Sequence, residues 1–325
     1  MSKSRCKYLI NQCAFYKCSN KKRLWHLLEV EDAKFIRDLE SIRKYHSFNI
    51  DKKGTDEKRE ITAPDAVLKR LQARILKLLQ SIERPSWLIS SEKGKCYIDN
   101  GRAHISSSYL LAIDIKKFYD NCKREPVYRF FTESMMTAPD IAGILTDIVT
   151  YQNGIPTGCP TSQMMAYYAY QKMFDEIASV ASNYGCVFTL YVDDMTFSSG
   201  QSFTYQRLAN DIDIILRKYG HKPKYKKVRY YSKSDYKPIT GTIVTPWLTL
   251  KVPNNLQKKI YDNFQNAKLA DITALKTKET RKKIATLRGQ IQAAKNICPE
   301  KFPEISRLVN NMERSIPVNH FSSKG

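Results

Sequence analysis

The chain has 325 residues, with 54 Lys and Arg against 32 Asp and Glu, so its formal net charge is +22. That surplus favours a polyanionic partner, nucleic acid first, over the alternative of a merely soluble basic protein. No apolar run approaches the roughly 18 residues of a membrane-spanning helix, and the first residues lack the apolar core of a secretion signal, so we expect a cytoplasmic protein without a membrane partner.

The first part of the chain predicts two helices around a charged hairpin. Residues 24–45 carry apolar side chains at helical spacing. Residues 49–64 are charged and have Gly54 at the expected turn. Residues 65–83 form an amphipathic pattern that Asp65 would cap at its N-terminus.

The middle of the chain predicts alternating strands and helices. Residues 109–114 are an apolar strand, residues 161–180 are expected to form one long helix, and residues 186–199 are expected to form two strands around a tight turn. Residues 217–237 are the most basic stretch, and from about residue 252 the pattern is helical and basic. The fold class that follows is α+β, with a helical, basic C-terminal third.

Eight cysteines are scattered without a paired C-x-x-C spacing, which is typical of reduced and mostly buried thiols. Cys6, Cys13, Cys18 and His26 could be drawn as a zinc site, but their spacing matches no common zinc pattern. We interpret these thiols as packing residues.

The most informative stretch places two adjacent carboxylates, Asp193 and Asp194, between short apolar runs. A pair of aspartates is usually a structural turn, but here the strand at residues 109–114 also ends in a carboxylate, Asp114. Two carboxylates about 4 Å apart repel by roughly 4 kcal/mol at an effective dielectric of 20. Two Mg²⁺ ions would offset this repulsion and support phosphoryl chemistry. These residues alone are compatible with both a nuclease and a nucleotidyl transferase.

Four motifs in order resemble the reverse transcriptase family. "YVDD" at residues 191–194 is similar to its catalytic turn, and "LAIDIKKFYD" at residues 111–120 is similar to its first catalytic strand. "REI" at residues 59–61 and "GIPTGCPTSQ" at residues 154–163 resemble the segments that support the incoming nucleotide and the template. The resemblance covers about residues 30 to 300.

Further motifs resemble the bacterial retron enzymes within that family. These motifs are "NGRAH" at residues 100–104, "ITG" at residues 239–241 followed by "LKVPNNLQKKI", and "TLRGQIQAAKNICPEKF" at residues 286–302. Three positions depart from the family pattern: Thr157 replaces Gln, Gly101 replaces Ala and Ile239 replaces Val. From the length of 325 residues we expect no maturase, endonuclease or ribonuclease H module beside the polymerase.

The resemblance implies a right-hand polymerase of fingers, palm and thumb. The implied boundaries are an N-terminal extension at residues 1–30, fingers at 31–108, a palm at 109–244 with a fingers insertion near 120–155, and a helical, basic thumb at 245–325.

The resemblance also implies the site residues. Asp114, Asp193 and Asp194 would be catalytic, and with the Ile115 backbone they would hold two Mg²⁺ ions, for which Mn²⁺ could substitute. The implied nucleotide-binding residues are Lys58, Arg59, Tyr119, Thr157, Gly158 and Lys227. The implied RNA-binding residues are Asn100, His104, Ile239, Thr240, Gly241, Val252, Pro253, Asn254 and Arg288. Packing for Tyr119 and His104, and a solvated charge for Arg59 and Lys227, remain alternatives.

The implied function is RNA-templated DNA synthesis from dNTPs on a cognate structured non-coding RNA (msr-msd). Synthesis would start at an internal guanosine 2′-hydroxyl and yield branched msDNA, with host ribonuclease H and a separate effector protein as partners in antiphage defence. The alternatives are another bacterial reverse transcriptase, group II intron-like or of the abortive-infection class, and a non-catalytic RNA-binding protein on the same scaffold.

Overall fold

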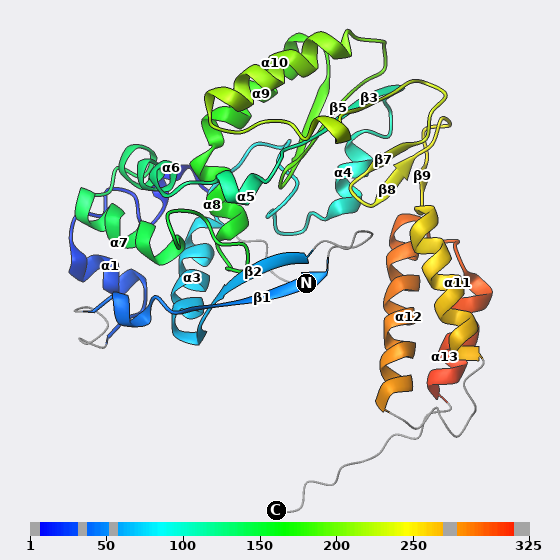
Figure 1. Ribbon diagram of the computed structural model, residues 1–325, viewed down its shortest axis with the longest axis horizontal. Coiled ribbons are helices and arrows are strands. Elements are labelled where there is room, and N and C mark those ends of the chain that lie inside the picture. Colours follow the sequence, from blue (N-terminus) through cyan, green and yellow to red (C-terminus); the bar gives the residue numbers. More distant parts are fainter. Residues whose placement is uncertain (1–6, 32–37, 52–57, 269–277, 315–325) are drawn as a thin grey trace, which may run out of the picture. The chain divides into compact units, whose positions relative to one another are not determined.

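The computed structural model describes residues 7–31, 38–51, 58–268 and 278–314 (Figure 1). The chain forms two compact units. Unit 1 comprises Met1–Cys96, Leu111–Ser199 and Phe203–Tyr230, and unit 2 comprises Tyr97–Leu110, Gly200–Ser202 and Tyr231–Gly325. Both units combine helices with antiparallel strands, so the predicted α+β class is confirmed. Within the described residues, no helix has the length and apolarity required to cross a bilayer.

Unit 1 begins with short helices and a long hairpin. In order these are η1 (Ile10–Gln12), α1 (Lys21–Leu27), η2 (Glu40–Ile42), β1 (Tyr45–Asp51), β2 (Lys58–Pro64) and α3 (Ala66–Leu79). The antiparallel register of the hairpin sets Tyr45 opposite Pro64 and Ile50 opposite Arg59. Figure 1 shows this hairpin as a long blue ribbon, and β2 packs against α3. The predicted turn at Gly54 lies outside the described residues.

The helix predicted over residues 24–45 is wrong at both ends. Helix α1 ends at Leu27, because Glu29 adopts a left-handed φ of 58° that a helix cannot contain. Tyr45 already belongs to β1, since strand pairing with β2 overrides the helical spacing of the apolar residues. Residues 32–37 of this prediction lie outside the described residues.

Helix α3 is shorter than predicted and lacks the predicted cap. It ends at Leu79 rather than at residue 83, and Leu68, Leu71 and Ile75 on its apolar face are buried as expected. Asp65 occupies the N-cap position, but its side chain lies 3.2 Å from Nδ1 of His46 and makes no capping hydrogen bond.

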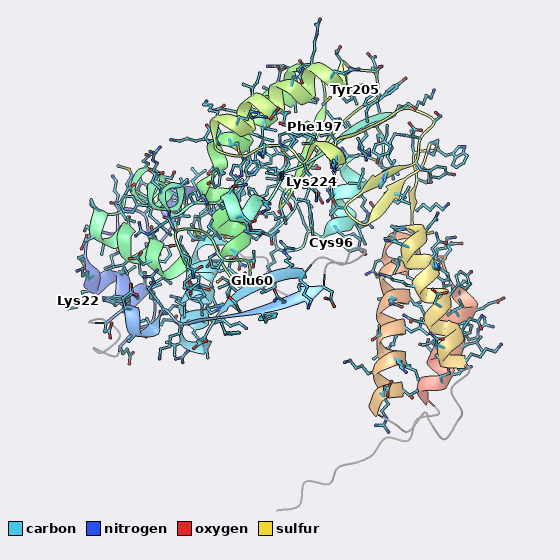
Figure 2. All side chains as sticks on the ribbon, in the orientation of Figure 1. Lys22, Glu60, Cys96, Phe197, Tyr205 and Lys224 are labelled. Carbon is cyan, nitrogen blue, oxygen red and sulfur yellow. The ribbon has the colours of Figure 1, made fainter. Side chains whose placement is uncertain are left out.

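A four-stranded sheet with the strand order β4-β5-β3-β6 lies mostly in unit 1. Its strands are β3 (Tyr109–Asp114), β4 (Val187–Tyr191), β5 (Asp194–Ser199) and β6 (Arg229–Tyr231). Helix α9 (Gln171–Asn183) packs on β4, and α10 (Tyr205–Lys218) packs on α9. Phe197, labelled in Figure 2, is fully buried in the core of this unit together with Phe131 and Phe174.

The remaining helices of unit 1 follow β3 or lie between the strands in sequence. They are α5 (Phe118–Asn121), α6 (Arg124–Arg129), the π-helical turn η3 (Phe130–Ser134), α7 (Pro139–Val149), α8 (Ser162–Ala169) and η4 (Tyr225–Lys227). The single helix predicted over residues 161–180 is wrong, because Tyr170 separates α8 from α9. The Tyr170 hydroxyl donates to the carbonyl of Asn121 at 2.9 Å and accepts from the backbone N of Lys123 at 3.1 Å, and these contacts hold the break.

Unit 2 has its own small sheet and its own core. Its elements are α4 (Tyr97–Ala103), β7 (Lys237–Ile239), β8 (Thr242–Val244), β9 (Leu250–Lys251), α11 (Asn254–Lys268), α12 (Lys278–Ile297) and α13 (Pro303–Arg314). The three C-terminal helices bury Ile260, Phe264, Leu287 and Ile291 between them. The helical pattern predicted beyond residue 252 is confirmed in the described residues, and it is interrupted between Ile297 and Pro303, where α13 begins.

Candidate active site

The two adjacent aspartates lie at a strained two-residue turn. Tyr191 of β4 pairs with Asp194 of β5, so Val192 and Asp193 form the turn between them. Val192 has a φ of 62°, a region that a β-branched residue seldom adopts and that glycine usually fills in such turns. Its backbone N donates to the hydroxyl of Ser90 at 2.9 Å, and Ser90 is buried. Ser90 therefore holds the turn in its strained form.

Residues 87–90 bring Ser90 to the turn by running alongside β4. Leu190 N donates to the carbonyl of Trp87 at 2.9 Å, and Ile89 N donates to the carbonyl of Leu190 at 3.0 Å. Leu88 thereby forms a parallel bridge with Leu190. Ser90 was not among the predicted site residues, because a short apolar run followed by serine does not indicate which strand it will pair with.

Strand β3 delivers the third carboxylate. Ile115, the residue after Asp114, donates its backbone N to the carbonyl of Asp193 at 3.1 Å, which joins the end of β3 to the turn. The backbone of residues 222–224 pairs with the same end, since Lys224 N donates to the carbonyl of Asp114 at 2.7 Å. The Lys227 ammonium forms an ion pair with the Asp114 carboxylate.

The electrostatics of this cluster indicate an excess of negative charge. Burial, followed by the charges of Asp193 and Asp114, raises the pKa of Asp194 to about 6. Burial followed by the Asp114 charge also raises the pKa of Asp193. The hydrogen bond to Asp114 raises the pKa of Lys227, which therefore stays cationic. A cation placed among these carboxylates would stabilise the charged form of each.

These donors fit a divalent cation in their chemistry. Carboxylate oxygens are the ligands that Mg²⁺ prefers in proteins, and the effect of neighbouring charges on the two pKa values shows that the three side chains interact. Among the described residues, no three metal-ligating side chains already converge on a single point. In this arrangement Lys227 supplies part of the positive charge that the carboxylates require.

The loop predicted to support the nucleotide is fastened to β2. Gly158 N donates to the carbonyl of Thr62 at 2.9 Å, and the Thr157 hydroxyl donates to the carbonyl of Glu60 at 3.3 Å. A Cβ at position 158 would lie 2.5 Å from the Thr62 oxygen, so only glycine permits this approach. The hydroxyl of Thr157, at the position where the family has Gln, is engaged with the protein backbone.

Arg59 and Tyr119 lie within electrostatic range of the aspartate turn. Burial raises the pKa of both Asp193 and Tyr119, and the Arg59 guanidinium opposes that rise in each. Tyr119 is half-buried beside Phe118, with ring centroids 5.6 Å apart. Lys58 is exposed on β2, and no interaction ties it to the carboxylates in the described structure. The electrostatics therefore relate Arg59, rather than Lys58, to the turn.

His221 anchors the start of the segment that pairs with Asp114. Its ring lies 4.5 Å from Tyr170 and 5.3 Å from Phe118 between centroids. In the described part of the chain neither ring nitrogen has a hydrogen-bond partner, and burial followed by the Lys123 charge lowers the pKa of His221 to about 4. The imidazole is therefore neutral near pH 7.

The buried His221 predicts a loss of stability in acid. Because its folded pKa lies below the ordinary 6.5, neutral His221 stabilises the fold above pH 6.5, and this stability is lost as pH falls through about 4. The difference between the two pKa values corresponds to at most about 3.4 kcal/mol. We expect the His221→Phe variant to lose less stability than wild type between pH 6.5 and 4. Urea unfolding at a series of pH values measures this, and equal pH profiles would contradict it.

In unit 2 the two retron-like motifs contact each other. Ile239 of β7 pairs with Thr242 of β8, so Thr240 and Gly241 form a two-residue turn in which φ is positive at both positions, 38° and 86°. Asn100 Nδ2 donates to the hydroxyl of Thr240 at 2.8 Å. The asparagine of "NGRAH" thus fixes the turn of "ITG".

A neighbouring contact explains why Gly101 replaces alanine. A Cβ at position 101 would clash with Oγ1 of Thr242, which is buried and donates to the carbonyl of Ile239 at 2.9 Å. The absence of a side chain at Gly101 therefore leaves the space that the Thr242 side chain occupies.

This pair predicts a coupled effect on stability. We expect Gly101→Ala to lower the free energy of unfolding by about 1–2 kcal/mol, since overpacking outweighs the helix propensity of alanine. Adding Thr242→Ala removes the clash, so the double variant should lose less than the sum of the two single variants. Thr242→Ser keeps the hydroxyl and should not rescue Gly101→Ala. Denaturant unfolding measures every variant, and strict additivity would count against the pairing.

Burial changes the roles of several predicted RNA-binding residues. Asn100, His104, Ile239 and Val252 are buried, so their side chains are not presented on the surface. Burial lowers the pKa of His104 to about 3, and the ring is neutral. At these four positions burial favours a positioning role over the predicted direct RNA contact. The remaining predicted residues, Thr240, Gly241, Pro253, Asn254 and Arg288, are exposed or half-buried.

The conceivable zinc site does not form among the described residues. Cys13 and Cys18 are buried in the core, as the packing interpretation requires, and His26 is exposed. Cys6 lies outside the described residues. The packing interpretation does not extend to Cys96, which is exposed.

Known proteins resemble this chain along most of its length. Residues 50–270 match the family model described as reverse transcriptase (RNA-dependent DNA polymerase). Retron Ec86 reverse transcriptase of Escherichia coli is 26% identical over 204 residues, which are 62% of this chain and 63% of that protein. Retron Se72 reverse transcriptase of Salmonella heidelberg (strain 579083-10) is 25% identical over 53% of this chain and 45% of its own length.

A longer match is with Retron Ec48 reverse transcriptase of Escherichia coli, which is 24% identical over 297 residues, 86% of this chain and 72% of that protein. This chain thus spans 63% of the length of the first relative and 45% of the length of the second. Because the family model covers more than half of the sequence and includes the aspartate turn, the chain belongs to the reverse transcriptase (RNA-dependent DNA polymerase) family, in which it is similar to retron enzymes.

Proposed function

We propose that the chain is a retron-type, RNA-directed DNA polymerase that synthesises branched msDNA on a cognate structured RNA. The observation that carries the proposal is the cluster of Asp114, Asp193 and Asp194, which the hydrogen bond from Ile115 N to the carbonyl of Asp193 brings to one sheet edge. Burial first, and then the neighbouring carboxylates, raises the pKa of both turn aspartates. Nucleotidyl transfer requires such oxygen ligands next to a site for a triphosphate. Membership of the reverse transcriptase family and similarity to retron enzymes support the choice of template and product.

In this proposal the three aspartates and the Ile115 carbonyl hold two Mg²⁺ ions, with Mn²⁺ as a substitute. When bound, the ions supply activation of the attacking hydroxyl and neutralisation of the leaving pyrophosphate. Lys227 pairs with Asp114 in this structure. Its ammonium is the proposed contact for the pyrophosphate when the Asp114 carboxylate holds Mg²⁺ instead.

The other side chains bind and select the nucleotide. Arg59 offers a planar, bidentate guanidinium to the triphosphate from β2, with Lys58 one residue away as an exposed second cation. Thr157 and Gly158 brace β2 through its backbone and thereby fix the position of Arg59. The half-buried ring of Tyr119 would exclude a ribose 2′-hydroxyl and select dNTPs.

We place the fingers at residues 31–108, the palm at 109–244 with an insertion near 120–155, and the thumb at 245–325, after an extension at 1–30. The central sheet that carries the aspartates supports the palm, and the bundle of α11, α12 and α13 supports a helical thumb. The proposed contacts of unit 2 with RNA are the exposed or half-buried residues Thr240, Gly241, Pro253, Asn254 and Arg288.

The function is tested by supplying purified protein with RNA transcribed from the DNA that flanks its gene, together with Mg²⁺ and dNTPs. We expect DNA covalently attached to RNA, so that the two migrate together in a denaturing gel until ribonuclease removes the RNA. Linear DNA formed only from added 3′ ends would indicate another class of reverse transcriptase. RNA binding without any DNA synthesis would indicate a non-catalytic scaffold. A role in antiphage defence with a separate effector follows only if the branched product forms.

A further inference from the structure

An exposed aromatic surface lies on the small sheet of unit 2. Trp247, in the loop between β8 and β9, is 72% exposed, and Tyr236, just before β7, is 45% exposed. Their rings meet edge to face with centroids 6.0 Å apart, and the Lys251 ammonium lies 5.2 Å from the centroid of Tyr236. We call Tyr236, Trp247 and Lys251 the aromatic platform.

The loop that presents Trp247 is closed by its own hydrogen bonds. Thr245 N donates to the carbonyl of Thr249 at 2.9 Å, and Leu248 N donates to the carbonyl of Thr245 at 3.0 Å. The hydroxyls of Thr245 and Thr249 lie 2.7 Å apart. Leu248 adopts a left-handed φ of 59°, which is unfavourable for this residue. The loop is therefore ordered in a strained form that leaves a large apolar ring in solvent.

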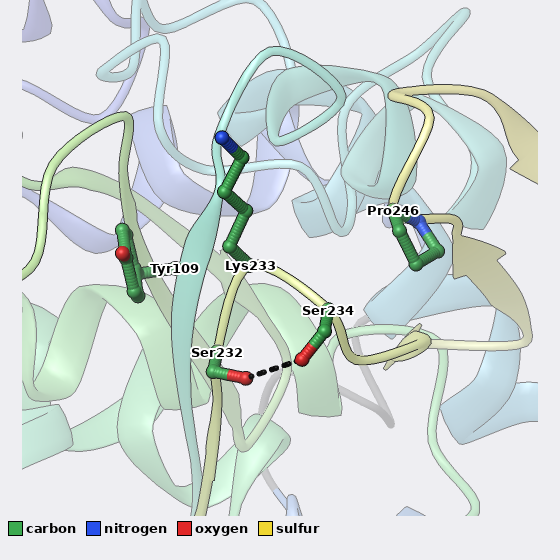
Figure 3. A pocket seen from close by; sticks show the side chains of 5 residues that line it. All are labelled: Tyr109, Ser232, Lys233, Ser234 and Pro246. Atoms are coloured by element: carbon green, nitrogen blue, oxygen red, sulfur yellow. Dashed lines mark hydrogen bonds between the residues drawn. The ribbon is translucent and has the colours of Figure 1, made fainter.

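An open pocket of about 480 Å³ is lined by Tyr109, Ser232, Lys233, Ser234 and Pro246 (Figure 3). Pro246 is the residue before Trp247, and residues 232–234 come shortly before Tyr236 in the sequence. The hydroxyls of Ser232 and Ser234 lie 3.2 Å apart, and Figure 3 shows this contact as a dashed line. Ser232 also donates its backbone N and its hydroxyl to the Asp235 carboxylate, both at 2.7 Å. Lys233 and Asp235 are both exposed, and because Asp235 is engaged with Ser232 within the turn, Lys233 is the exposed cation of residues 232–235.

We propose that the aromatic platform stacks unpaired bases of single-stranded RNA, with Lys233 and the serine hydroxyls contacting the adjoining sugar-phosphate backbone. Aromatic rings beside cations are what sequence-tolerant recognition of unpaired bases requires. Charge favours this occupant over a protein, since the sequence of unit 2 carries 18 Lys and Arg against eight Asp and Glu. The inference rests on the proposed function in taking the ligand to be RNA.

Trp247 provides its own fluorescent reporter. The chain has three Trp residues, and Trp25 is buried while Trp87 is half-buried, so Trp247 is the most solvent-accessible of them. The probe is a 12-nucleotide single-stranded RNA of mixed sequence, compared with a blunt RNA duplex of the same length. We expect the single strand to quench Trp emission in the wild type and the duplex to quench it much less, because paired bases are already stacked.

Substitutions separate stacking from charge. Affinities are measured by anisotropy of a labelled single strand at several salt concentrations. We expect Trp247→Ala to weaken binding about tenfold without changing the salt slope, and Trp247→Phe to retain most of the affinity. Lys233→Ala should weaken binding and reduce the magnitude of the log–log salt slope by about 0.7, the contribution of one phosphate in a single strand. Tyr261→Ala, which removes a 52%-exposed aromatic ring on α11 outside the platform, is the matched control and should bind as wild type.

The Trp247→Ala variant decides between RNA and a protein as the occupant of this face. Wild-type affinity in Trp247→Ala, or equal quenching by the duplex, would overturn the proposal and leave the face to a protein partner. A Trp247→Ala variant that melts at the wild-type temperature but binds weakly supports the proposal. If that variant is unstable, the comparison of Trp247→Phe with Lys233→Ala decides. Retained affinity in Trp247→Phe and a reduced salt slope in Lys233→Ala support the proposal, and the opposite results overturn it. If the wild type synthesises DNA but Trp247→Ala binds single-stranded RNA as tightly as the wild type, the aromatic platform is rejected and the proposed function stands. If single-stranded RNA stacks on Trp247 but the wild type synthesises no DNA, the proposed function is rejected and the platform stands.

Discussion

The Asp193→Asn variant should lose DNA synthesis by roughly a thousandfold or more while it remains folded. Removing one carboxylate withdraws a ligand from cations that contribute several kcal/mol to the transition state, and each 1.36 kcal/mol is a tenfold change in rate. The fold should tolerate the change, because Asn has nearly the same shape and removes a charge whose pKa burial and Asp114 raise. Primer extension on an RNA template measures the rate, and melting measures the fold.

A matched control is available for this variant. Asp120 is an exposed carboxylate one residue after Tyr119, and its side chain is 63% exposed. Asp120→Asn changes the net charge equally and should leave extension near the wild-type rate. RNA affinity should be similar in both variants, since the positive surface is unchanged. Substantial synthesis by Asp193→Asn would contradict the assignment of the aspartate turn as the metal site.

The clustering of the three carboxylates was predictable because its signal is local. "YVDD" between two apolar runs indicates a hairpin, and an apolar strand that ends in Asp114 indicates a partner at the same sheet edge. The structure joins the two through the hydrogen bond from Ile115 to Asp193. Short-range patterns of this kind are sufficient where strand pairing follows the order of apolar runs.

Other features depended on contacts between residues far apart in sequence. Tyr170 breaks a regular helical pattern because its hydroxyl is held by Asn121 and Lys123. Asn100 resembles an RNA contact in the motif, but it is buried against Thr240, 140 residues later. No window of local sequence contains the partner in either case, so tertiary contacts overrode the local pattern.

Ser90 is the site residue that the sequence did not indicate, and its removal should reduce the rate of DNA synthesis by between about tenfold and a hundredfold. Ser90→Ala leaves the backbone N of Val192 without its acceptor, and the turn is then free to leave the strained φ of 62°. Such a shift would displace Asp193, and displacements of about 1 Å can cost a hundredfold in rate. The loss should appear in kcat and in the metal concentration needed for half-maximal activity, with little change in KM for dNTPs.

Val192→Gly distinguishes this positioning role from a general loss of packing. Glycine adopts a positive φ without strain, so a turn that carries the Val192→Gly substitution needs no support from the serine hydroxyl. The double variant Ser90→Ala with Val192→Gly should therefore recover most of the rate that Ser90→Ala loses, while Ser86→Ala, at an exposed serine of the same segment, should have little effect. If the double variant is as slow as Ser90→Ala, the serine acts through packing and not through the strain of the turn. Recovery of the rate would instead mean that the buried Ser90 hydroxyl sets the geometry of the aspartate turn, although Ser90 is far from Asp193 in sequence. The hydroxyl would do so because it stabilises a backbone conformation that Val192 alone would not keep.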